Sequence, residues 1–201
     1  TAYKDQAAIL AKLQQMVADR PQIASLVSIG TTLEGRSIWA LKITGPGANK
    51  PGVLFNGAQH AREWISPMTC MWIADRLVYE YGVNLELTAL VNNLEFFIVP
   101  VVNPDGYAFT WSSNRLWRKN RHVFGTCIGT DNNRNWGAGW GGEGAGTSPC
   151  DDTYRGPSAF SELETQALRD YFIANPNIVS TIDFHSYSQL ILSPFGYTNA
   201  L

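Results

Sequence analysis

Two histidines and one glutamate carry the most specific chemistry in this 201-residue sequence. His60 follows residues 53–59 and Glu63 comes three positions later, while His185 follows residues 179–184. Each histidine stands where a predicted strand meets a loop, and open α/β sheets place their ligands just beyond strand ends. Two imidazoles and a carboxylate bind Zn²⁺ and leave a fourth position for water, as in catalytic zinc sites. The pattern predicts such a site, although a capping glutamate beside a hydrogen-bonded histidine would explain H-x-x-E alone.

Arginine and asparagine residues gather near these positions in the sequence. Arg62 lies inside the H-x-x-E motif, Arg118 lies in the arginine-rich segment 114–121, and Asn133 and Arg134 lie in a long irregular loop. A guanidinium group can bind a carboxylate through two hydrogen bonds and can stabilise an oxyanion. A solvated surface position explains any one of these arginines, but it explains the Asn-Arg-Asn-Trp cluster less well.

The composition is that of one globular domain without a nucleic-acid or membrane signature. Hydrophobic residues make up 45% of the chain, charged residues make up 16%, and the formal net charge is −2. A chain of this size buries about 70% of its unfolded surface, which is enough for a single core. The apolar stretches are shorter than the roughly 20 residues that a membrane helix needs. We therefore expect neither a nucleic-acid nor a membrane partner.

Hydrophobic periodicity predicts alternating strands and helices, and hence one α/β domain over residues 1–201. We expect a mixed, largely parallel twisted sheet with helices on both faces and the zinc site at the strand ends. The predicted helices are 3–18, 64–81 and 161–175, and the predicted strands are 23–29, 37–43, 52–56, 94–102, 179–184 and 190–193.

Local signals add detail to these elements. The helix 64–81 is apolar on nearly every side, which predicts burial all round. The segment Asn103–Gly106 is a strong turn signal after the central strand. The segment Ser161–Glu164 has the form of a capping box that opens the last helix. The long loop that ends near Pro157 is expected to be functional.

The three cysteines have different expected roles. Cys70 lies in an apolar helical run, which predicts a buried free thiol. Cys127 and Cys150 bracket a glycine-rich loop of 22 residues. A disulfide there would restrict the unfolded chain by about 3 kcal/mol on the loop-entropy model. Such a bond favours an oxidising compartment, so we expect a secreted, extracellular protein.

The chain resembles the zinc metallocarboxypeptidases of the pancreatic carboxypeptidase A/B type. Six segments carry the resemblance in the family's order: HAREW at 60–64, VNPDGY at 102–107, NRLWRKNR at 114–121, DNNRNW at 131–136, PCDDTYRG at 149–156 and DFHSYSQL at 183–190. Each segment is a weak signal alone, and together they are highly specific. The resemblance implies one zinc ion per chain and hydrolysis of the C-terminal peptide bond of peptides and proteins.

The resemblance also implies the roles of residues around the metal. His60, Glu63 and His185 would be the zinc ligands, and Arg118 would stabilise the tetrahedral oxyanion. Asp131 matches a carboxylate outside the ligand set that orients one zinc-bound imidazole. An Asx turn that opens the loop would also explain Asp131.

A second group of matched residues concerns the substrate and the disulfide. Asn133 and Arg134 would bind the free C-terminal carboxylate of the substrate, with Arg62 and Tyr187 lining neighbouring subsites. The pair Cys127–Cys150 matches the family disulfide. His122, in contrast, matches no functional position and is expected on the surface.

Three roles of the family match no residue of this sequence. The general-base Glu, the mobile Tyr and the floor of the specificity pocket belong to the C-terminal third of the family's catalytic domain. The sequence stops at Leu201, before all of them, and Glu34, Glu143, Glu162 and Glu164 lie in the wrong segments. We therefore expect a truncated domain that binds zinc yet is inactive alone. It would have an exposed sheet edge, and a complementary C-terminal fragment would be a partner.

Two readings from other classes share the H-x-x-E and His pattern. One is an aspartoacylase-like zinc amidohydrolase, against which Asn133, Arg134, Tyr187 and the disulfide favour the peptidase. The other is a noncatalytic zinc-binding module, which the unmatched general base makes conceivable.

Overall fold

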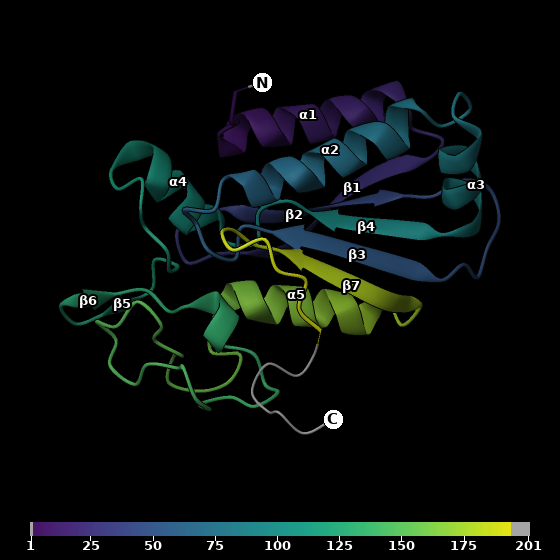
Figure 1. The fold of residues 1–201 in the computed structure, drawn as a ribbon. Coiled ribbons are helices and arrows are strands. Elements are labelled where there is room, and N and C mark those ends of the chain that lie inside the picture. The colour runs from purple at the N-terminus through teal and green to yellow at the C-terminus, as the bar shows by residue number, and fades with distance from the viewer. Residues whose placement is uncertain (1, 194–201) are drawn as a thin grey trace.

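The computed structural model describes residues 2–193, which fold around a mixed β-sheet with helices on both faces (Figure 1). Five strands of this part of the chain form the sheet, and their spatial order is β1 (Ala24–Thr31), β2 (Ser37–Ile43), β4 (Glu95–Val99), β3 (Gly52–Gly57) and β7 (Ile178–Phe184). β2 pairs antiparallel with β1 and β4, whereas β3 pairs parallel with β4 and β7. The predicted α/β class is confirmed. The described sheet is evenly mixed and not largely parallel, because the hairpin β1–β2 contributes antiparallel pairs.

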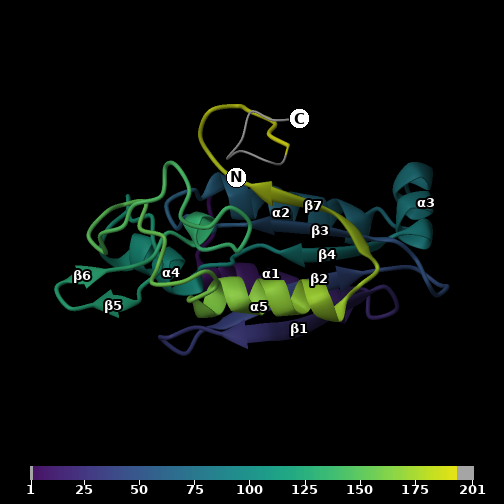
Figure 2. The same ribbon diagram turned by 90° about the horizontal axis from the view of Figure 1, so that it is seen from below.

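The helices lie on the two faces and at the two ends of the sheet. Helices α1 (Gln6–Asp19) and α2 (Ile65–Tyr79) cover one face, and α5 (Leu163–Ala174) covers the other (Figures 1 and 2). Helix α3 (Leu85–Asn93) precedes β4 at one end, and α4 (Pro104–Ser112) follows it at the opposite end. Within residues 2–193, no helix combines the length and the apolar character that crossing a membrane requires.

Strand β4 supplies side chains to the core on both sides of the sheet. Phe96 and Ile98 join the cluster under α1 and α2, and Phe97 and Val99 join the cluster under α5. Successive side chains of a strand point to opposite faces, so a continuous apolar run fits a strand covered on both sides. The prediction of a buried central strand is confirmed. Cys70 of α2 lies in the first cluster as a buried free thiol, also as predicted.

The segment Asn103–Gly106 begins helix α4, so the prediction of a turn there is wrong. The Asn103 side chain accepts a hydrogen bond from the Gly106 amide at 2.9 Å, and Pro104 occupies the first turn. Asn before a helix and Pro in its first turn are favourable at a helix start, for the same local reasons that favour them in turns. The buried ring of Tyr107 then holds the helix in the core.

The capping box predicted at Ser161–Glu164 is also wrong. Helix α5 begins at Leu163, and the Ser161 hydroxyl donates to the Glu162 side chain rather than capping the helix. The helix has no side-chain cap, and the side-chain oxygen of Asn135 accepts bonds from the Glu162 amide and the Thr165 hydroxyl. A contact between segments far apart in sequence thus replaces the local motif.

Two further expectations differ from the structure. Helix α2 is not buried all round, since Trp72 is 62% exposed and Ile65 is 46% exposed. Residues 190–193 form no strand, and their apolar side chains, Leu190, Ile191 and Leu192, face solvent. The expectation about the chain end at Leu201 falls outside the described residues.

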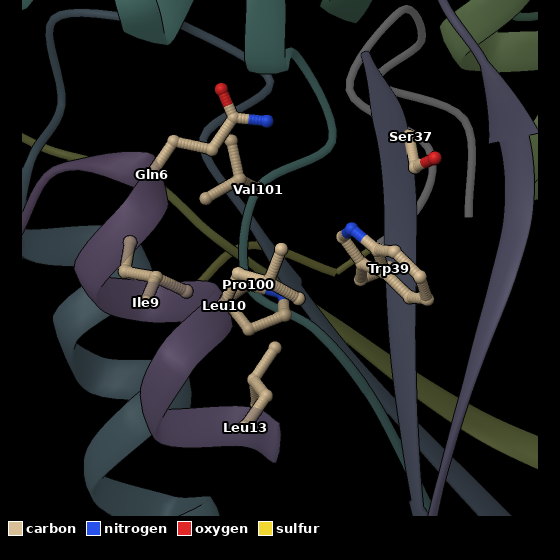
Figure 3. A pocket seen from close by; sticks show the side chains of 8 residues that line it. All are labelled: Gln6, Ile9, Leu10, Leu13, Ser37, Trp39, Pro100 and Val101. Carbon is tan, nitrogen blue, oxygen red and sulfur yellow. The ribbon is translucent and has the colours of Figure 1, made fainter. Parts of the chain in front are cut away.

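Helix α1 packs on β2 and on the segment that follows β4. Ile9, Leu10 and Leu13 face Trp39 and Pro100 across a gap of about 20 Å³ (Figure 3). A gap of this size has room for about one water molecule. It is a packing defect, too small to bind a peptide.

The disulfide between Cys127 and Cys150 forms as predicted, with the two Cα atoms 5.0 Å apart. Cys127 belongs to the short hairpin of β5 (Val123–Phe124) and β6 (Cys127–Ile128). Cys150 closes the glycine-rich loop, which contains little secondary structure of its own. The bond therefore ties a poorly packed loop to the segment beside α4.

Replacing both bridged cysteines, as Cys127→Ser with Cys150→Ser, should lower the free energy of unfolding by about 3 kcal/mol. The reason is that the unfolded chain regains the freedom of a 23-residue separation. Urea unfolding of the variant and the unaltered protein measures the difference. Equal unfolding midpoints and slopes would show that the loop is held by its packing alone.

Candidate metal centre and active site

The parallel strands β3 and β7 bring the two histidines together. Gly57 at the end of β3 pairs with Phe184 at the end of β7. His60 and Glu63 lie in the loop after β3, and His185 directly follows β7, so all three side chains gather at one edge of the sheet. This placement is the one predicted from strand ends.

Hydrogen bonds of the backbone and of Ser66 fix the loop that carries His60 and Glu63. The Ser66 hydroxyl accepts from the Ala58 amide at 2.9 Å and donates to the Glu63 carbonyl at 2.8 Å. Gly57 lets α2 approach closely, because a Cβ atom there would lie 3.0 Å from the Ser66 backbone. The loop therefore holds its side chains on a rigid turn.

The three side chains converge on one point. His60 Nδ1 lies 2.8 Å from Glu63 Oε1, His185 Nδ1 lies 2.9 Å from Glu63 Oε2, and the two Nδ1 atoms lie 3.1 Å apart. Zn–N and Zn–O bonds of about 2.0–2.1 Å in a tetrahedral site put ligand atoms roughly 3.3 Å apart. His60 and Glu63 are buried, and His185 is partly exposed. The donor set and its spacing fit a zinc ion with access from solvent.

The outer nitrogen of each imidazole faces a carboxylate. His60 Nε2 lies 3.0 Å from Asp131 Oδ1, and His185 Nε2 lies 2.6 Å from Asp183 Oδ2. When a metal takes the Nδ1 lone pair, each Nε2 carries the hydrogen, and the carboxylate beside it accepts that hydrogen. The two carboxylates thus favour the tautomer that metal binding needs.

The charges of the cluster reinforce one another. Burial opposes ionisation of Glu63, but hydrogen bonds from His185 and His60 outweigh it and lower the pKa of Glu63 to about 2. Burial likewise opposes the charging of His185, but Asp183 and Glu63 raise the pKa of His185 to about 10. Without metal, the cluster holds a proton that zinc would displace on binding.

Arg118 lies against the same centre. Its Nη2 donates to Asp131 Oδ2 at 2.7 Å and its Nε to the same oxygen at 3.1 Å. The Arg118 carbonyl accepts from the Ala61 amide at 3.0 Å, which joins the arginine segment to the H-x-x-E loop. Asp131 is fully buried and bridges Arg118 to His60, while its other contact, from the Asn133 amide, forms the Asx turn considered above. Both interpretations of Asp131 are compatible.

The proposed substrate-binding residues differ in how firmly they are held. Arg134 donates from Nε to the Gly144 carbonyl and from Nη1 to the Asn133 carbonyl, each at 3.0 Å. Arg62 donates to the Leu116 carbonyl at 3.3 Å. Tyr187 is 96% exposed, so its side chain is not packed against the centre.

Three polar residues beside the centre received no role from the sequence. Asp183 accepts hydrogen bonds from the side-chain amides of Asn56 and Gln59 as well as contacting His185. Asp183 lies two residues before His185 on a strand, so the two side chains share a face of the sheet. The spacing of two residues between Asp and His in the segment DFH is the sequence signal that would have identified Asp183.

The glutamates of other segments do not contact the centre. Glu34 pairs with Arg36, and the buried Glu162 and Glu164 both accept from the Asn120 amide. His122 Nδ1 lies 2.9 Å from Glu162, so His122 is a half-buried partner of that carboxyl and not a purely surface residue. Asn120, His122, Glu162 and Glu164 form a polar cluster separate from the metal centre.

The substitution Glu164→Gln should raise the free energy of unfolding, relative to the unaltered protein, more at pH 8 than at pH 5. Burial raises the pKa of Glu164 to about 7 from 4.5. The folded state therefore binds the proton more tightly, and the stability from this group is present below pH 4.5 and lost as the pH rises through 7. The loss is roughly 3 kcal/mol, and the uncharged glutamine avoids it.

Urea unfolding at pH 5 and pH 8 measures this difference. Asp170→Asn is the matched control, because Asp170 lies on the same helix but is exposed. If the free energy of unfolding changes equally between pH 5 and pH 8 in Glu164→Gln and in the unaltered protein, Glu164 does not hold a proton in the folded state.

The zinc carboxypeptidase family matches residues 9–201 of the chain. Human carboxypeptidase B is 46% identical over 192 residues, which cover 94% of this chain and 46% of that protein. Rat carboxypeptidase A1 is 43% identical over 92% of this chain and 44% of its own length. This chain thus spans about half the length of the curated relatives it matches.

Solved structures agree with the sequence relatives. The crystal structure of thrombin-activatable fibrinolysis inhibitor matches with a TM-score of 0.95 and 36% identity, over 98% of this chain and 51% of that one. Carboxypeptidase A from Helicoverpa armigera matches with a TM-score of 0.85 and 35% identity, over 92% of this chain and 46% of that one.

The mixed sheet with two histidines and a glutamate at its strand ends is the framework of a metallopeptidase domain. This chain belongs to the zinc carboxypeptidase family.

Proposed function

We propose that the protein is a zinc-dependent metallocarboxypeptidase that hydrolyses the C-terminal peptide bond of peptides and proteins. The observation that carries the proposal is the convergence of His60 Nδ1, His185 Nδ1 and the Glu63 carboxylate, within 2.8–3.1 Å of one another, in a chain of this family. His60, Glu63 and His185 are the proposed ligands of one zinc ion. Bound zinc polarises a carbonyl and makes a water molecule a nucleophile near neutral pH.

Arg118 is the proposed stabiliser of the oxyanion. Asp131 binds two of its N–H groups and so fixes the plane of the guanidinium beside His60. A guanidinium has five N–H donors, so others remain for the oxygen of the reacting carbonyl. A donor fixed in advance costs no reorganisation when negative charge develops.

Asn133 and Arg134 are the proposed binding site of the substrate's terminal carboxylate. The carbonyls of Gly144 and Asn133 hold the Arg134 guanidinium in place. A fixed, planar cation recognises a carboxylate through paired hydrogen bonds, which an internal peptide bond cannot offer. Arg62 and Tyr187 are proposed to line neighbouring subsites.

The proposal places the proton acceptor for the attacking water outside residues 2–193. Glu63, Asp131 and Asp183 each accept bonds from the histidines of the centre, so none is free to act as a general base. General acid–base catalysis needs a carboxylate within hydrogen-bond reach of the water. A complementary C-terminal segment that supplies it is therefore part of the proposal, and residues 2–193 by themselves would bind zinc without turnover.

The disulfide between Cys127 and Cys150 supports an extracellular location, because disulfides persist in oxidising compartments. We therefore propose that the protein is secreted.

Two peptides that differ only in a free or an amidated C-terminus test the proposal. Incubated with the zinc-loaded protein and its complementary C-terminal segment, the free peptide should lose single residues from its C-terminus, while the amidated peptide stays intact. A zinc chelator should stop the reaction. Equal cleavage of both peptides, or hydrolysis of N-acylated amino acids instead, would favour the amidohydrolase class. Zinc binding with no hydrolysis even when the C-terminal segment is supplied would favour the noncatalytic module.

A further inference from the structure

Asp183 stands at the meeting point of three hydrogen-bond donors. The Asn56 amide donates to Oδ1, the Gln59 amide donates to Oδ2, and His185 Nε2 lies 2.6 Å from Oδ2. Asn56 is the register partner of Asp183 across the parallel pair β3–β7, and both Asn56 and Gln59 are buried. The carboxylate is therefore fixed by neighbours on the adjacent strand and loop.

The orientation of the Gln59 amide follows from a fourth residue. The indole Nε1 of Trp136, which can only donate, gives a bond of 2.9 Å to Gln59 Oε1. The NH₂ group of Gln59 must then point the other way, toward Asp183. A chain of bonds runs from Trp136 through Gln59 and Asp183 to His185, and each member fixes the next.

We propose that Asp183 is a positioning residue for His185, the counterpart of Asp131 at His60, and this inference rests on the proposed zinc-dependent function. With Nε2 held by the carboxylate, the ring cannot flip, and its Nδ1 faces His60 and Glu63. Carboxylates that hold the outer nitrogen of a ligating histidine fix its tautomer and increase its basicity as a ligand.

Asp183 also borders a cavity of about 380 Å³ that Asn133 and Trp136 help to line. A carboxylate in that position is also placed to accept a bond from a basic substrate side chain. Three of its roughly four lone-pair sites already accept bonds from the protein itself. These bonds hold the carboxylate toward the histidine and leave one site on the side of the cavity.

The test compares zinc affinity in Asp183→Ala and Asp183→Asn by competition with a chromophoric chelator. Asp183→Ala should bind zinc 10- to 100-fold more weakly, which is about the effect of losing such an outer partner. Asp183→Asn keeps an oxygen that can accept from Nε2, so its loss should be smaller. The visible spectrum of the Co²⁺-loaded Asn variant should also change, because a neutral amide leaves the His185 imidazole less basic as a ligand.

Asp170→Asn, an exposed carboxylate on α5, is the matched control for zinc affinity and for the Co²⁺ spectrum. Thermal unfolding without metal shows which variants fold. If the Ala variant does not fold, the Asn variant decides the test. Unchanged zinc affinity and an unchanged spectrum in a folded Asp183 variant overturn the inference while the metal centre stands. Weaker binding of peptides with a basic C-terminal residue, at unchanged zinc affinity, overturns it in favour of the cavity role. Absence of zinc binding in the unaltered protein overturns the proposed function itself.

Discussion

Glu63→Gln is expected to lower the zinc affinity of the protein on the order of 10³-fold. Protein zinc sites have apparent binding free energies of roughly 10–16 kcal/mol, and three ligands share the binding here. Glutamine keeps the size of the side chain but loses the charge that faces both Nδ1 atoms. Competition with a chromophoric chelator at constant pH measures the change.

Glu86→Gln is the control for this substitution, because Glu86 is an exposed residue in the first turn of α3. It should bind zinc as the unaltered protein does. Should Glu63→Gln retain the full affinity, the carboxylate is not a ligand, and the zinc site would have to be sought elsewhere in the chain.

Arg134→Ala is expected to weaken the binding of a peptide with a free C-terminus on the order of 10²-fold, because a hydrogen bond to a charged group contributes about 1.5–3 kcal/mol and Arg134 is partly buried. The same variant should bind the amidated peptide as the unaltered protein does, since that peptide lacks the charge. Calorimetric titration of both peptides measures the two affinities without requiring turnover.

Arg76→Ala is the matched control, because Arg76 pairs with Glu80 on the outer side of α2. It should leave both affinities unchanged. A similar loss for the free and the amidated peptide in Arg134→Ala would mean that Arg134 supports the loop and does not recognise the carboxylate.

The sequence was sufficient to predict which residues gather at the centre, but it did not reveal all the hydrogen-bond partners that hold them in place. His60, Glu63 and His185 were found because the ends of predicted strands meet at one sheet edge. Asp183 was not singled out, since its role depends on the Asn56 and Gln59 amides, which only the pairing of β3 with β7 brings near.

The errors in predicted elements have similar physical causes. The Glu162 amide at the start of α5 donates to Asn135, a partner 27 residues away, which a local motif cannot reveal. Helix α3 was missed because only Val91 of its residues is buried, so its apolar residues show no clear period. The exposure of Trp72 depends on which face of α2 meets the sheet, and an almost uniformly apolar helix does not indicate that face.

The coordination shell of zinc in the unaltered protein tests the central claim most directly. X-ray absorption at the zinc edge should show only nitrogen and oxygen neighbours at about 2.0–2.1 Å, with the scattering pattern of two imidazoles, as His60, His185 and Glu63 require. Sulfur neighbours at about 2.3 Å, or a shell without imidazole scattering, would contradict the account, because the metal would then lie at another site.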